Sequence, residues 1–187
     1  MDALMAALVA ALLAQAGDRQ GWVAARLARQ FDRPAIVLIM ATIAMAIGYG
    51  LGGFAGGLMA PILTPNARAL LLAVALVSSG ASALWPPRPL PQSGGATLGV
   101  AATALITLLA ASMGDRTQFI VAALAARSDA PLFAAIGGTL GSVAAFGAMM
   151  AYGEPRRGGP VAAIRIGSGV ILIIAGAIAG LSALRLI

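Results

Sequence analysis

Residues 98–126 have the sequence LGVAATALITLLAASMGDRTQFIVAALAA, an apolar stretch with one Asp-Arg pair near its middle. A helix needs about 20 residues to cross the hydrocarbon core of a membrane, and a charge placed there costs roughly 2.5–3.5 kcal/mol on insertion scales. The first apolar stretch of the chain carries the same tripeptide, Gly17-Asp18-Arg19. Two copies of so unfavourable a feature predict a duplicated functional site at mid-membrane depth.

The composition places most of the chain in lipid. Of the 187 residues, 60% are hydrophobic and only 10% are charged, whereas soluble domains carry about 25% charged residues. The apolar runs are long and continuous, which favours membrane helices over a barrel. All basic residues are Arg and lie mainly between these runs, which is typical of membrane anchors and not of a nucleic-acid surface.

The chain has no Cys and no His, so proton chemistry falls to carboxylates, and disulfides and thiolate metal sites are excluded. No nucleophile–base pair, phosphate loop or cofactor motif is visible. We therefore predict neither an enzyme nor a resident cofactor.

The pattern predicts an all-α integral membrane protein with six transmembrane helices. The expected spans are residues 2–26, 35–58, 67–84, 98–126, 132–152 and 163–184. The stretch 94–126 is longer than one straight crossing requires, so it tilts, extends beyond the surface or breaks near Gly114.

The two halves of the chain correspond. The segment 15–20, Gln-Ala-Gly-Asp-Arg-Gln, aligns with the segment 112–117, Ser-Met-Gly-Asp-Arg-Thr. Each half holds three spans, so the second half enters the membrane in the opposite sense. We expect two inverted three-helix repeats, residues 1–90 and 91–187, that form one compact membrane domain and bring Asp18 and Asp115 together near the midplane.

The distribution of Arg predicts the orientation, because cytoplasmic loops are rich in basic residues. One side of the predicted topology carries Arg26, Arg29, Arg33, Arg88, Arg156, Arg157 and Arg165, and the other carries Arg68, Arg127 and Arg185. The first side should be cytoplasmic, with both termini outside the cytoplasm.

Glycines recur four residues apart in three spans, as Gly48, Gly52 and Gly56, as Gly137 and Gly141, and as Gly176 and Gly180. Small residues allow membrane helices to approach closely. We expect these glycines to pack helices within one chain, with a homodimer face as the alternative.

The duplicated tripeptide in a six-span pattern resembles the Gdt-type cation/proton exchangers, bacterial and Golgi membrane proteins implicated in calcium and manganese transport. Their motif is Glu-x-Gly-Asp-(Lys/Arg)-(Thr/Ser), once in each of two inverted repeats. The second half matches best, with Gly114-Asp115-Arg116-Thr117. The resemblance implies a secondary transporter that moves Mn²⁺ or Ca²⁺ across the inner membrane of a bacterium in exchange for protons. Its partners are then the lipid bilayer, the cation and protons.

The chain departs from that motif at both glutamates, which are Gln15 and Ser112 here, and Gln20 replaces a Thr or Ser. The full motif would set four carboxylates against two basic residues, whereas two Asp face two Arg in this chain. Neutral oxygens of Gln15, Ser112, Thr117 and Gln118 could complete the coordination of a cation bound by Asp18 and Asp115. Losing both glutamates should still weaken divalent binding, because hard cations gain most from anionic ligands.

Two arrangements of the arginines stay open. Neighbouring residues do not share a helix face, so Arg19 and Arg116 could point away from a pathway lined by the carboxylates, while Gly17 and Gly114 let the helices open. Alternatively, Asp18 pairs with Arg116 and Asp115 with Arg19 in a crossed structural lock. The lock would suit a non-transporting homologue or partner subunit, and a neutral site would also suit a transporter of another small solute.

Overall fold

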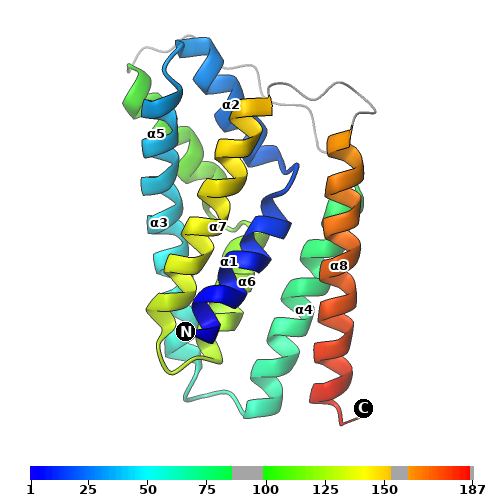
Figure 1. The fold of residues 1–187 in the computed structure, drawn as a ribbon. Helices are drawn as coiled ribbons and strands as arrows, with labels where there is room; N and C mark the ends of the chain where they lie inside the picture. The colour runs from blue at the N-terminus through cyan, green and yellow to red at the C-terminus, as the bar shows by residue number, and fades with distance from the viewer. Residues whose placement is uncertain (86–98, 153–159, 186–187) are drawn as a thin grey trace.

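The computed structural model describes residues 1–85, 99–152 and 160–185, which form eight helices in one elongated bundle (Figure 1). The helices are α1 (Asp2–Gln15), α2 (Arg19–Phe31), α3 (Pro34–Met59), α4 (Pro65–Leu84), α5 (Val100–Ser112), α6 (Arg116–Ala126), α7 (Pro131–Tyr152) and α8 (Pro160–Ala183). The described residues contain no strand. Arg88, Arg156 and Arg157 lie outside the described ranges, so their predicted place on the cytoplasmic side stays a prediction.

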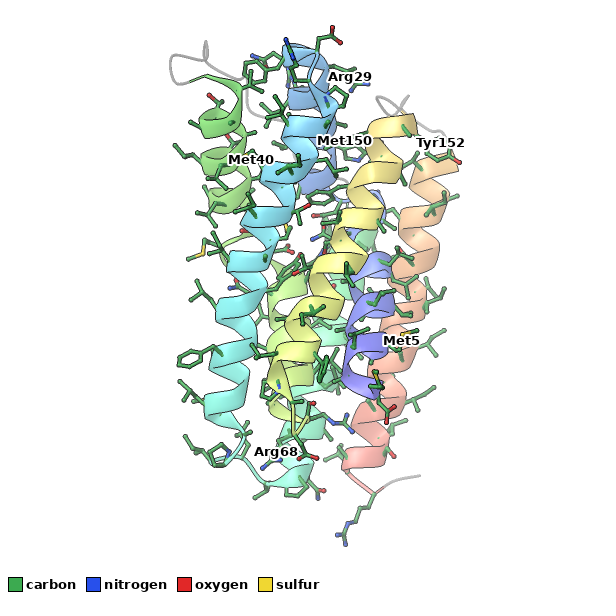
Figure 2. The ribbon with its side chains drawn as sticks, turned by 60° about the vertical axis from the view of Figure 1, so that its left-hand side comes forward. Met5, Arg29, Met40, Arg68, Met150 and Tyr152 are labelled. Carbon is green, nitrogen blue, oxygen red and sulfur yellow. The ribbon has the colours of Figure 1, made fainter. Side chains whose placement is uncertain are left out.

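Within the described ranges, four helices are long and apolar enough to cross a membrane, namely α3, α4, α7 and the part of α8 over Val161–Ala183. α1, α5 and α6 are shorter apolar helices. Large aliphatic side chains are exposed on the outside of the bundle, as at Leu51 and Ile174. Arg29 and Arg68 lie near its opposite ends (Figure 2). The all-helical membrane class is therefore confirmed.

Both charged tripeptides interrupt a helix. The chain over 2–26 is not one helix, since α1 ends at Gln15 and α2 begins at Arg19 and continues to Phe31. The long stretch 94–126 breaks near Gly114, one of its three expected outcomes. Gly17 and Gly114 have φ values of +71° and +77°, a left-handed conformation that glycine adopts without steric cost.

The packing of the helices pairs each half with the other. α1 packs on α7, and its counterpart α5 packs on α3; α2 contacts α7, and its counterpart α6 contacts α3. α3 also packs on α7, and α4 packs extensively on α8. Both termini lie at the same end of the bundle (Figure 1). These helix contacts are related by exchange of the two halves, whereas the contacts of α4 with α6 and of α8 with α1 have no equivalent of similar extent among the described residues.

The main core lies between α1, α3, α5 and α7, where Met45, Tyr49, Leu108 and Phe146 are fully buried. The α4–α8 pair stands to one side of this core and reaches it chiefly through α6 and α1 (Figure 1). The site described below lies where this pair meets the two helix breaks.

The repeated glycines pack helices within the chain, as predicted. A Cβ atom at Gly56 would clash with the backbone of Ala122 in α6, and one at Gly137 would clash with the backbone of Leu4 in α1. A Cβ atom at Gly176 would lie 2.8 Å from Cγ2 of Val77 and 2.9 Å from the carbonyl oxygen of Ala73, both in α4. These close approaches use the small residues inside the bundle, and the homodimer stays a prediction.

Candidate cation site

A polar cavity of about 730 Å³ joins the two helix breaks. Its lining includes both complete tripeptides, Gly17, Asp18, Arg19, Gly114, Asp115 and Arg116. Its outer part is formed by Ser82 near the end of α4, by Trp85 directly after that helix, and by Arg165 in the first turns of α8. These ends of α4 and α8 lie away from the two termini, so the cavity reaches the tripeptides from that end of the bundle (Figure 1).

Asp18 forms an ion pair with the arginine of the other half. Its Oδ1 lies 2.5 Å from Nη2 of Arg116, and the two side chains are 17% and 15% exposed. Arg116 also donates to the carbonyl oxygen of Ala14 at 2.8 Å and to Oγ of Ser82 at 2.7 Å. The guanidinium group therefore ties α6 to the end of α1 and to α4, and neutralises Asp18.

The second pair of the crossed lock is absent among the described residues. Arg19 is exposed on the cavity wall, and no hydrogen bond or ion pair joins it to Asp115 in the described part of the chain. The structure thus forms one half of the lock.

Asp115 lies in a buried hydrogen-bond network instead. Its Oδ2 accepts from Nε2 of Gln15 at 3.0 Å and from the backbone N–H of Thr117 at 3.2 Å. Nε2 of Gln15 also lies 3.0 Å from the Tyr49 hydroxyl and 3.1 Å from Oγ1 of Thr117. The Tyr49 hydroxyl is in turn 2.9 Å from Oγ of Ser142. The network therefore links α1, α3, α6 and α7 behind the wall of the cavity.

Of the other two predicted ligands, Ser112 bonds within α5 and Gln118 ties the second break to α3. Ser112 donates to the carbonyl oxygen of Leu109 at 2.8 Å. Gln118 donates to the carbonyl oxygen of Gly48 at 2.9 Å and accepts from the backbone N–H of Gly114 at 2.8 Å. None of these side-chain bonds reaches the carboxylate of Asp115, so side-chain hydrogen bonds join Gln15 to Asp115 and Thr117, whereas Ser112 is joined to Asp115 through its backbone carbonyl alone.

Tyr49 and Ser142 were not predicted as site residues. Both are completely buried, and each follows a glycine, Gly48 or Gly141, in an otherwise apolar helix. A polar residue inside a membrane helix marks a functional position by default, and that signal was present in the sequence.

The tripeptides are closed off from the end of the bundle that holds the termini. Ala14, Leu76, Ile120 and Ala123 pack into an apolar cluster there. A second cavity of about 520 Å³ lies beyond this cluster and is lined by Met1, Asp2, Ala3, Ala6, Leu72, Leu124, Arg127, Ser128, Asp129 and Ala130. Access to Asp115 is therefore one-sided.

Fold and site together define a helical membrane protein of several crossings, in which two broken helices bring duplicated Asp-Arg motifs to one polar cavity. Comparison with known families makes the class specific. The family described as "Divalent cation/proton antiporter GDT1" matches residues 3–89 and 100–186, so the chain belongs to this family of transporters, which are not enzymes.

A bacterial relative gives a further comparison. The chain is 25% identical over 146 residues to a protein of Vibrio cholerae serotype O1 (strain ATCC 39541 / Classical Ogawa 395 / O395) named "Putative manganese exporter". The match covers 78% of this chain and 73% of that protein. No solved structure matches the chain. The family resemblance drawn from the duplicated tripeptide is confirmed.

Proposed function

We propose that the chain is a secondary transporter that exchanges a divalent cation, Mn²⁺ or Ca²⁺, for protons, with Asp18 and Asp115 as the carriers near the membrane midplane. Cation/proton exchange is the description of its family, and the name of the Vibrio cholerae relative favours Mn²⁺. The carriers belong to separate halves of the chain and line the same cavity, which is the observation that supports the proposal most directly.

The proposed topology has six crossings, in which α1 with α2 and α5 with α6 each make one. Residues 1–90 and 91–187 are then inverted halves, a relation supported by the corresponding contacts of α1 and α2 with α7 and of α5 and α6 with α3. Broken helices at the interface of inverted repeats commonly form the substrate site of secondary transporters. The bacterial relative favours the inner membrane of a bacterium, and the arginine distribution favours an orientation with both termini outside the cytoplasm.

The proposed mechanism uses the single Asp–Arg ion pair, between Asp18 and Arg116, that the described residues form. Asp18 is neutralised by Arg116, while Asp115 is held by neutral donors and lines the cavity. Because the halves are related, rocking them to open the other end would release Asp18 from Arg116 and pair Asp115 with Arg19. Each carboxylate would then serve one side of the membrane, and cation and proton would compete for its oxygens.

Within this mechanism, Gln15 and Thr117 support Asp115 directly. Ser112 and Gln118 position the second break through their bonds to Leu109, Gly48 and Gly114. Gly17 and Gly114 supply the turns that separate the half-helices.

The test is Mn²⁺ flux into proteoliposomes under an imposed proton gradient. Asp115→Asn and Asp18→Asn should each abolish gradient-driven flux, because each removes one carrier. Asp129→Asn, a carboxylate lining the cavity at the other end, is the matched control and should retain flux. Unchanged flux in both carrier variants would contradict the proposal.

The ion pair between Arg116 and Asp18 also favours a second candidate, a non-transporting homologue in which the pair is structural. Gln15→Glu discriminates the two functions, because it restores the family carboxylate beside Asp115 at nearly constant side-chain volume. Flux gained by this variant from a silent wild type would favour the second candidate. Ser112→Glu is less suitable as a second change, because Ser112 packs closely against Gly48 of α3. A Cβ atom added at Gly48 would lie only 3.1 Å from Oγ of Ser112, so a longer side chain at position 112 would be crowded.

A further inference from the structure

An apolar groove of about 490 Å³ lies between α7 and α8. Among the described residues, these two helices have no extensive contact with each other, and α1 contacts both and contributes the lining between them. The lining is almost entirely aliphatic and aromatic. Small residues leave the space open, namely Ala144 and Ala148 on α7 and Gly167 on α8.

The groove opens towards the lipid. Tyr152, Ile164 and Ile171 line it, and each of these side chains is more than half exposed. Both α7 and α8 are long and apolar enough to cross a membrane. Atoms that line an empty space lose their dispersion contacts, so an aliphatic groove beside hydrocarbon is more stable when a lipid chain fills it.

The dimensions of the groove select its occupant. On α8 the lining runs from Val161 to Ile171, which is about 15 Å along the helix axis. That length is half of the roughly 30 Å hydrocarbon core, the depth of one leaflet. A helix of the same length and about 10 Å across would fill roughly 1,200 Å³, more than twice the volume of the groove. The groove therefore fits a lipid acyl chain and is too small for a helix of a second copy.

The outer end of the groove carries groups that suit a phospholipid headgroup. Tyr152 lines the groove at the last residue of α7, and it lies towards the end of the bundle where Arg29 lies (Figure 2). Trp22 lines the groove from α2, and Arg26 follows one turn further along the same face of that helix. Arg26 has no hydrogen bond or ion pair to any described residue. Basic groups between membrane helices recognise anionic lipid headgroups.

We propose that this groove binds an acyl chain of an anionic phospholipid, whose phosphate lies at Arg26 and the hydroxyl of Tyr152. The chain lies against Ala16, Gly17 and Trp22, which line the groove. Gly17 also lines the polar cavity, so the lipid supports the first helix break from the opposite side. Lipid binding here is independent of the exchange function.

The experiment uses Trp22 as its reporter. The chain has only two tryptophans, so Trp85→Phe leaves Trp22 alone. The full-length variant is reconstituted into phosphatidylcholine vesicles with increasing fractions of dibrominated phosphatidylglycerol, whose bromine atoms quench tryptophan fluorescence at short range. Trp22 is 5% exposed, so a chain in the groove is well placed to quench it.

Quenching should saturate at a low fraction of dibrominated phosphatidylglycerol. Dibrominated phosphatidylcholine should need a fraction about fivefold higher, which is the effect of one arginine on an anionic lipid. Absence of saturable quenching by either lipid would overturn the site. Equal fractions at half-quenching would overturn the preference for an anionic headgroup.

Two variants fill the groove in the Trp85→Phe background. Gly167→Leu places a side chain in it from α8, and Ala148→Leu does so from α7, so each should remove the saturable quenching. Gly147→Leu is the matched control for Gly167→Leu, because a Cβ atom at either glycine would meet nothing within 4 Å and Gly147 does not line the groove. Saturable quenching that survives both filling variants would overturn the site.

A charge variant tests the headgroup contact separately. Arg26→Gln should remove the preference for phosphatidylglycerol, so that both brominated lipids quench Trp22 at the same fraction. Arg127→Gln, which changes an arginine lining the cavity at the other end of the bundle, should keep the preference. An unchanged preference in Arg26→Gln would overturn the contact between Arg26 and the phosphate.

Discussion

The two Gly-Asp-Arg copies have the same backbone and different side-chain partners. Both glycines have positive φ, and both aspartates are extended residues that precede a helix. In the first copy, Asp18 bonds to an arginine of the other half, and Arg19 is exposed on the cavity wall. In the second copy, Asp115 accepts from Gln15 of the other half, and its neighbour Arg116 bonds to Ala14, Asp18 and Ser82.

This difference shows how a duplicated motif can serve a one-sided site. A structure with perfect symmetry between the halves would form both Asp–Arg pairs or neither. The observed structure forms one pair, and its cavity reaches the tripeptides from one end only. The asymmetry of the ion pairs and the asymmetry of access occur together, as expected if exchanging the pairs accompanies opening at the other end.

The largest expected effect distinguishes the two arginines. Arg116→Gln should lower the free energy of unfolding by about 3–5 kcal/mol, because it leaves Asp18 largely buried without its partner. Arg19→Gln should leave that free energy nearly unchanged, since Arg19 is exposed and bonds to no described residue. Denaturant titration in detergent micelles would measure both.

A double variant checks the cause of that loss. Asp18→Asn combined with Arg116→Gln removes the unpaired charge. The double variant should therefore lose clearly less free energy of unfolding than the sum of the two single variants. Strictly additive losses would show that Arg116 acts through Ala14 and Ser82 alone.

The second effect concerns the aromatic residues that follow each tripeptide at equivalent positions. Trp22 is 5% exposed and donates from its indole nitrogen to the carbonyl oxygen of Gly17 at 3.3 Å, whereas Phe119 is 62% exposed. Trp22→Ala should cost about 3 kcal/mol of stability, and Phe119→Ala should cost far less. The same unfolding assay measures both, and similar losses would mean that the two breaks are equally supported.

Much of this arrangement could be predicted from the sequence. Continuous apolar runs gave the helical membrane class, and the duplicated tripeptide gave the family and the pair of carboxylates. Glycine spacing predicted close packing inside the chain, because only a missing side chain lets helix backbones meet, as at Gly56 and Ala122.

The partners of each polar side chain could not be predicted, because they depend on how the halves are rotated against one another. Sequence alignment equates Gln15 with Ser112, yet Gln15 reaches across to Asp115 while Ser112 bonds within its own helix at Leu109. Tyr49 enters the site from α3, far from either tripeptide in the chain. Such contacts follow from tertiary packing and leave only a weak mark in the sequence, an isolated polar residue in an apolar helix.

The smallest expected effect compares the two glycines of the breaks. An alanine at either position would be strained, because φ is positive there. This strain costs roughly 1–2 kcal/mol of stability. A Cβ atom at Gly17 would also lie 3.1 Å from Cβ of Arg165, whereas one at Gly114 would meet nothing within 4 Å.

Gly17→Ala should therefore destabilise the protein more than Gly114→Ala, by a further fraction of a kilocalorie up to about 1 kcal/mol. Gly50→Ala is the matched control, because Gly50 is helical in α3 and its Cβ would meet nothing within 4 Å. That change should be neutral or slightly stabilising, as expected from helix propensity. Equal losses at Gly17 and Gly114 in denaturant titrations would mean that α8 yields at Arg165, and that the first break is no more tightly enclosed than the second.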